Sequence, residues 1–218
     1  LHGGLSHSDI WGYQIPPLTA AGYRVVVADS RGHGRSTRSA RPFGYALMAS
    51  DVAALMESLK IGKAAIIGWS DGGIIGLDLA MNHADRISKV FAFGANTSVA
   101  GSRDDIGSNA VFNRFMNNMA ADYGRLSPTP AEYEDFVAQI TAMWATQPNY
   151  TAEQLARIQV PVLIADGDHD EAIRQEHNRE MVGLIPGAKL NILTGTSHFA
   201  FLQKPEQFNA AILEFLRE

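Results

Sequence analysis

Residues 64–73, AAIIGWSDGG, decide the fold that we expect for this chain. They begin with a short apolar run, pass through a Gly-x-Ser-x-Gly motif at residues 68–72 and continue into a segment with helical spacing. The glycines around Ser70 permit a sharp strand-to-helix turn, because side chains there would clash with the neighbouring backbone. Such a turn holds the Ser70 hydroxyl beyond the end of the strand. We therefore expect Ser70 to be a nucleophile and Asp71 to begin a helix.

Apolar runs and helical segments alternate along much of the remaining chain. The runs are nearly continuous, as in strands that are buried on both faces of a parallel sheet. Expected strands cover residues 24–28, 64–67, 90–93, 160–165 and 189–193. Expected helices cover residues 45–60, 71–83, 174–184 and 205–216. This alternation predicts an α/β fold with a doubly wound, mostly parallel sheet.

Residues 97–158 interrupt the alternation. They contain no convincing strand, but apolar residues with helical spacing occur at 109–119 and 133–144, on either side of a Ser-Pro-Thr-Pro turn. We expect a helical cap over residues 97–158, inserted into a core that is formed by residues 1–96 and 159–218. The methionines and aromatic residues of the cap are expected to pack mainly within the protein.

Composition excludes several classes of protein. The 218 residues are 46% hydrophobic and 19% charged, which is typical of one globular domain with an insertion. A net charge of −5 argues against nucleic acid or an anionic membrane as partner. With no cysteine, the chain has no disulfide, thiolate nucleophile or cysteine-based zinc site. No apolar run is long enough to span a bilayer, and a cytoplasmic location is the default expectation.

A serine nucleophile requires a base and an acid that orients the base. His198 follows the expected strand at 189–193, and Asp168 and Asp170 follow the one at 160–165. All three therefore lie at the carboxyl edge of the sheet, in the chain order serine, acid, histidine that this architecture uses. We expect a triad of Ser70, Asp170 and His198. Asp168 is the alternative acid, although it is expected to cap its own turn.

The remaining site residues complete the expected chemistry. The amides of Gly4, in the run His-Gly-Gly, and of Asp71 are expected to form an oxyanion hole. Alternatively, the early glycines only turn the chain. Trp69 and Trp144 are expected to contact substrate. The acids and histidines at 168–177 match no metal-ligand spacing, so neither a metal nor a cofactor is expected, and water releases the acyl group.

Taken together, these motifs resemble those of the α/β-hydrolase superfamily over the whole chain. They occur in the order of that superfamily at residues 2–4, 29–36, 68–73, 167–170 and 195–198. Residues 68–73 and the run Phe-Gly-Ala-Asn at 93–96 resemble the valacyclovir-hydrolase (biphenyl-hydrolase-like) branch. The resemblance implies a serine esterase that acts on small-molecule esters.

The branch implies esters of α-amino acids, with the carboxylate of Asp71 holding the ammonium group of the substrate. The alternative role for Asp71 is to favour the first turn of its helix. Amidase or aminopeptidase, C–C hydrolase and perhydrolase activities use the same triad and remain open. A ligand receptor without catalysis is the alternative from another class, because a fold does not determine function.

The resemblance also implies strands ahead of His2, where this chain has only Leu1. Without a central strand, two rows of backbone groups would be buried and unpaired. We therefore expect that an N-terminal portion precedes Leu1. Alternatively, another segment or a second copy of the chain fills the gap, which would give a rearranged sheet or an intimate homodimer.

Overall fold

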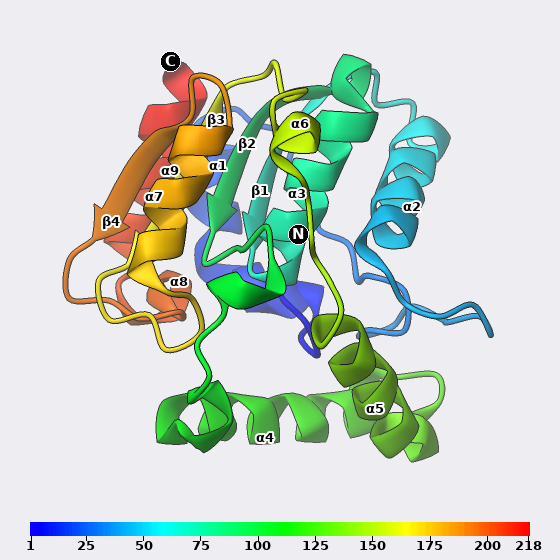
Figure 1. The fold of residues 1–218 in the computed structure, drawn as a ribbon. Helices are drawn as coiled ribbons and strands as arrows, with labels where there is room; N and C mark the ends of the chain where they lie inside the picture. Colours follow the sequence, from blue (N-terminus) through cyan, green and yellow to red (C-terminus); the bar gives the residue numbers. More distant parts are fainter.

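The computed structural model describes residues 1–218 and contains a parallel sheet of four strands in the order β1-β2-β3-β4. All four strands end at the edge that faces the green helices at the bottom of Figure 1. The predicted α/β fold with a parallel sheet is therefore confirmed. The strands are β1 (Ala64–Trp69), β2 (Ile87–Phe93), β3 (Val162–Gly167) and β4 (Lys189–Leu193).

Helices connect and cover the strands. All helices expected from spacing are present, and the helix expected at residues 109–119 continues to Leu126, well past the expected end at Met119. None of the helices has the length and apolar character needed to cross a membrane. The α-helices are α1 (Ile15–Ala20), α2 (Tyr45–Ser58), α3 (Asp71–Asn82), α4 (Ala110–Leu126), α5 (Tyr133–Trp144), α6 (Ala152–Leu155), α7 (Gln175–Leu184), α8 (Ala200–Gln203) and α9 (Pro205–Arg217). Short 3-10 helices cover Ser8–Tyr13, Ala84–Arg86, Val99–Gly101, Ile106–Ser108 and Pro130–Glu132.

The sheet has a separate hydrophobic core on each face. Along β2, Val90 and Ala92 belong to a core shared with α2, α3 and α7, whereas Phe91 and Phe93 belong to a core shared with α1, α8 and α9. All four β2 side chains are fully buried. Because side chains of a strand alternate between faces, a strand covered on both sides is apolar throughout. This burial explains the continuous apolar runs in the sequence.

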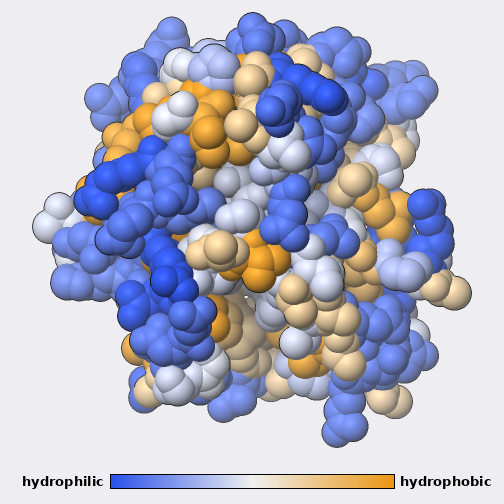
Figure 2. Space-filling model, viewed as in Figure 1, coloured by the Kyte–Doolittle hydropathy of each residue, from blue (hydrophilic) through white to orange (hydrophobic).

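Helices α4 and α5 lie across the carboxyl edge of the sheet (Figure 1). Residues 97–158, which include them, contribute no strand to the sheet. Phe136 and Ile140 of α5 are fully buried in the core that also contains α2 and α3. On the surface, hydrophilic side chains cover most of the same view, with hydrophobic ones in patches between them (Figure 2). The domain boundaries at 97 and 158 stay a prediction.

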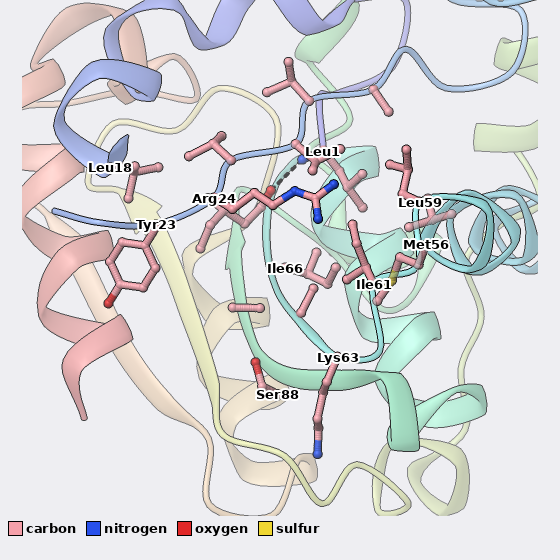
Figure 3. Close-up of a pocket in the computed structure, with 18 of the residues that line it drawn as sticks. Leu1, Leu18, Tyr23, Arg24, Met56, Leu59, Ile61, Lys63, Ile66 and Ser88 are labelled. Atoms are coloured by element: carbon pink, nitrogen blue, oxygen red, sulfur yellow. Dashed lines mark hydrogen bonds between the residues drawn. The ribbon is translucent and has the colours of Figure 1, made fainter. Parts of the chain in front are cut away.

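The strand expected at residues 24–28 is absent. These residues have no regular secondary structure, and their backbone makes no hydrogen bond with another part of the chain. A cleft of about 590 Å³ separates them from β1. Figure 3 shows Leu18, Tyr23 and Arg24 on one side of this cleft and Ile66 of β1 on the other. The prediction of a strand here is wrong, because an apolar β-branched run becomes a strand only when a neighbouring strand pairs with its backbone.

Candidate active site

Ser70 occupies the turn between β1 and α3. Its backbone is in the left-handed region, with φ 54° and ψ −123°, which is unfavourable for a residue with a side chain. The turn persists because the Ser70 amide donates a hydrogen bond of 2.8 Å to the carbonyl of Phe93 in β2. In addition, Gly68 packs so closely on the backbone of Gly72 that there is no room for a Cβ atom. The local structure thus holds a strained serine at the carboxyl edge of the sheet.

His198 and Asp170 form a hydrogen-bonded pair beside this turn. The distance from His198 Nδ1 to Asp170 Oδ2 is 2.6 Å, and the two side chains are 1% and 0% exposed. The other carboxylate oxygen of Asp170 accepts hydrogen bonds from the amides of Ala172 and Ile173, at 2.6 and 2.7 Å. Gly94 follows the Phe93 that binds the Ser70 amide, and a Cβ atom on Gly94 would lie only 2.8 Å from the imidazole. The imidazole therefore lies at the same edge of the sheet as Ser70.

Electrostatics support a charged Asp170 next to His198. Burial by itself lowers the pKa of His198, but the charge of Asp170 outweighs this effect, and the pKa of His198 is raised above 6.5. Burial by itself raises the pKa of Asp170, but His198 opposes this effect, and the pKa of Asp170 lies below its ordinary value. Asp166, buried beside Asp170, has its pKa raised well above the ordinary value by burial and by the Asp170 charge. The shifts of the two pKa values thus favour the negative charge on Asp170, beside His198, over Asp166.

Asp168, the alternative acid, makes no hydrogen bond to His198 and contacts other groups. Its Oδ1 accepts hydrogen bonds from the amides of Gly195 and Thr196, at 2.7 and 3.1 Å. These two residues belong to the loop that carries His198. Asp168 therefore ties the loop after β3 to the loop after β4.

Glu171 is a further residue of the site, which the sequence pattern does not predict. It is buried, and its Oε2 accepts a hydrogen bond of 2.8 Å from the backbone amide of His198. Its carboxylate therefore fixes the backbone of the histidine, whereas Asp170 fixes the imidazole. The only signal for it in the sequence is its place directly after Asp170, which does not distinguish it from a surface acid.

The loop at residues 2–4 lies against the nucleophile. A Cβ atom on Gly3 would be 3.0 Å from the Ser70 Cβ. His2 locks this loop, because its Nδ1 bonds the carbonyl of Gly3 at 2.7 Å and its Nε2 accepts from the Ser30 amide at 2.9 Å. Burial lowers the pKa of His2 to about 3, so this imidazole is neutral. The Gly4 amide makes no hydrogen bond within the chain, and the Asp71 amide, first in α3, has no acceptor within that helix.

The carboxylate of Asp71 accepts hydrogen bonds from two neighbouring side chains. Tyr45 Oη donates a hydrogen bond of 2.9 Å to Oδ1, and Trp144 Nε1 lies 3.0 Å from each carboxylate oxygen. Burial raises the pKa of Asp71 to about 6, against the hydrogen bonds from Trp144 and Tyr45, which favour the charged form. Asp71 itself is 4% exposed. Its carboxylate is thus enclosed rather than open to solvent.

Trp69, expected to contact substrate, serves packing in this structure. Its side chain is 1% exposed, and its ring centroid lies 5.5 Å from that of His198 and 4.7 Å from that of Phe201. The indole thus supports the imidazole from the core. Trp144, the other expected substrate contact, is only partly buried.

Two other features lie outside this arrangement. No three His, Asp or Glu side chains converge in a way that could hold a metal ion, and buried His177 instead accepts a hydrogen bond from the Thr97 amide at 3.0 Å. A cleft of about 590 Å³ lies beside β1, but none of Ser70, Asp170 and His198 lines it. We therefore locate the candidate active site from the contacts among its side chains, and not from the position of this cleft.

The sequence matches the model of the Alpha/beta hydrolase family over residues 1–211. The chain therefore belongs to the α/β-hydrolase family. RutD from a Caulobacter strain, described as a candidate carbamate hydrolase, is 28% identical over 99% of this chain and 89% of its own length. The human serine hydrolase BPHL is 27% identical over 95% of this chain and 74% of its own length. The solved structure of Est816, an N-acyl homoserine lactone degrading enzyme, has a TM-score of 0.81 and 26% identity, covering 99% of this chain and 91% of Est816.

Proposed function

We propose that this chain is a serine esterase that cleaves small carboxylic esters through an acyl-enzyme. The observation that carries the proposal is the buried hydrogen bond of 2.6 Å between His198 and Asp170, next to Ser70 in its strained turn. A nucleophile, a base and a charged acid in this chain order are the parts that acyl transfer requires. Membership of a hydrolase family supports the same chemistry.

The proposed reaction has two halves. Ser70 Oγ attacks the ester carbonyl, His198 Nε2 accepts its proton, and the alcohol leaves with that proton. Water then attacks the acyl group, with His198 again as base, and restores Ser70. Asp170 holds the imidazole with its Nδ1 protonated, and the free amides of Gly4 and Asp71 stabilise the oxyanion. Ser70 is not hydrogen-bonded to His198 in this structure, and in free enzymes such bonds commonly tighten only when substrate binds.

The surroundings of Asp71 favour plain esters over α-amino-acid esters. An ammonium group would have to compete with Trp144 and Tyr45, whose donors already reach both carboxylate oxygens. A lactone is a cyclic ester and undergoes the same acyl transfer. The likeness to Est816, which degrades N-acyl homoserine lactones, supports testing lactones as well.

Hydrolysis of a substrate panel tests the proposal. The panel contains p-nitrophenyl esters from acetate to decanoate, a valine ester and an N-acyl homoserine lactone. We expect turnover of plain esters, and a loss of at least about a thousandfold in kcat for Ser70→Ala. More than a tenth of wild-type activity in a folded Ser70→Ala variant contradicts the mechanism. Stoichiometric binding without turnover by the wild type supports the receptor alternative instead.

A further inference from the structure

Three helix ends meet at the carboxylate of Asp71. Asp71 is the first residue of α3, Tyr45 is the first residue of α2, and Trp144 is the last residue of α5. Tyr45 and Trp144 both donate to the carboxylate, at 2.9 and 3.0 Å. Because an indole nitrogen can only donate, the Trp144 bonds require an acceptor at this place. No other residue between 97 and 158 donates a hydrogen bond to Asp71.

The indole of Trp144 also covers Gly4. A Cβ atom at Gly4 would clash with the Trp144 ring and would lie 2.6 Å from Asp71 Oδ2. The ring therefore rests directly on the loop whose amide we assign to the oxyanion hole. A substrate that reaches this loop must fit beside the indole or displace it.

The carboxylate that Trp144 binds is more buried than those in the ion pairs of α4 and α5 with the core: in α4, Asp122, which lies 3.0 Å from His7, is 27% exposed. Arg38 pairs with Glu132 and Asp135 near the start of α5, but both carboxylates are more than half exposed. Exposed ion pairs contribute little to stability. Asp71 is buried, and hydrogen bonds to a buried carboxylate are strong because the charge needs donors in place of water.

We propose that Asp71 is a positioning residue whose carboxylate holds the indole of Trp144, and with it the end of α5, over Gly4. We call this contact between Asp71 and Trp144 the latch. The latch limits the length of the acyl group that the site accepts. The limit on acyl length rests on the proposed esterase function, whereas the latch itself does not. Asp71 therefore acts through Trp144, separately from the role of its backbone amide.

Quenching of tryptophan fluorescence by acrylamide tests the latch without any substrate. Trp11 and Trp69 are 4% and 1% exposed, so Trp144 is the tryptophan that acrylamide can reach most readily. Trp144→Phe supplies the background of the other two. We expect Asp71→Ala to raise the quenching constant at least twofold. Asp71→Asn should restore most of the wild-type value, because its amide oxygen can still accept from the indole.

Tyr45→Phe is the matched control for the latch. It removes a donor at a similar distance from the same carboxylate, but this donor comes from α2 rather than from α5. We expect its quenching constant to stay at the wild-type value. Equal quenching in Asp71→Ala and wild type, both shown to be folded by circular dichroism, overturns the latch. Equal increases in Asp71→Ala and Tyr45→Phe overturn it as well, because they indicate general loosening.

Kinetics with esters of different chain length test the limit on acyl length. In Asp71→Ala and Trp144→Phe, we expect the ratio of kcat/KM for decanoate over acetate esters to rise about tenfold. The gain should come from a lower KM for decanoate, with Tyr45→Phe unchanged. An unchanged ratio in both variants overturns the limit on length. If the wild type hydrolyses no ester, the esterase proposal fails, and the quenching experiment still decides the latch.

Discussion

The Nδ1 atom of His198 lies 2.6 Å from Oδ2 of Asp170, although the two residues are 28 positions apart in the chain. Asp170 follows β3 and His198 follows β4, and these strands are parallel neighbours in the sheet. Parallel neighbours end at the same edge, so the loops that follow them can meet. Both side chains are closed to solvent. Removal of either partner from such a pair leaves the other buried without compensation.

Asparagine substitutions distinguish the two candidate acids. Asp170→Asn removes the charge that orients His198, and we expect kcat for ester hydrolysis to fall at least about a hundredfold. Asp168→Asn is the matched control, because Asp168 bonds the amides of Gly195 and Thr196 and lies 3.8 Å from the exposed His169, and it makes no hydrogen bond to His198. It should lower kcat less than about tenfold. Steady-state kinetics with an acetate ester measure both effects, and the reverse ranking contradicts the assignment of Asp170.

The raised pKa of His198 predicts the acid limb of the pH profile. The imidazole acts as a base only when it is neutral, so kcat/KM falls as the pH decreases through the pKa of His198. Asp170 raises this pKa, and the midpoint of the limb is therefore expected above pH 6.5. In Asp170→Asn the residual activity should show a limb at lower pH, because the neighbouring charge is gone. A wild-type midpoint below pH 6.5 is the contrary result.

Gly68→Ala tests whether the nucleophile turn needs a glycine. The new methyl group would meet the backbone of Gly72, which cannot move without distorting the turn. We expect a loss of at least about 2 kcal/mol in the free energy of unfolding, together with most of the activity. Gly62→Ala is the control, because no atom beyond the adjacent residues lies within 4 Å of its added Cβ. Urea denaturation compares the two variants, and equal stabilities would show that the turn tolerates the methyl group.

Phe208→Ala tests the core on the α9 face of the sheet. Phe208 is fully buried against Phe91 and Phe93 of β2, with ring centroids 5.5 and 5.1 Å apart. Its truncation is expected to lower the free energy of unfolding by about 3–5 kcal/mol. Leu202→Ala, at a side chain that is 38% exposed, should cost less than about 1 kcal/mol. Similar losses in the two variants would mean that the buried Phe208 contributes no more to the free energy of unfolding than the exposed Leu202 does.

The strand-turn-helix at Ser70 was predictable because its signals are local. A short apolar run, a glycine on each side of the serine and helical spacing all lie within about 20 residues, and each restricts the backbone directly. The helix Tyr133–Trp144 and the strand Lys189–Leu193 have the bounds that their spacing predicts. The order of serine, acid and histidine could also be read from the chain, because it follows from the order of the parallel strands.

Residues 24–28 show where local signals fail. Their β-branched composition favours a strand, but the structure contains none at these residues. A strand, however, is defined by hydrogen bonds to a neighbour, and a cleft lies where that neighbour would be. Composition can therefore indicate a preference for strand structure, but it does not show whether a neighbouring strand is present to pair with.

The surroundings of Asp71 depend on the whole fold. Sequence patterns predict that this residue begins a helix, and it does. Its partners Tyr45 and Trp144 are 26 and 73 positions away, on two other helices. No periodicity or turn chemistry links residues so far apart, because their contact depends on how the helices pack around the sheet. The sequence thus carries the chemistry of the nucleophile, and packing determines what surrounds it.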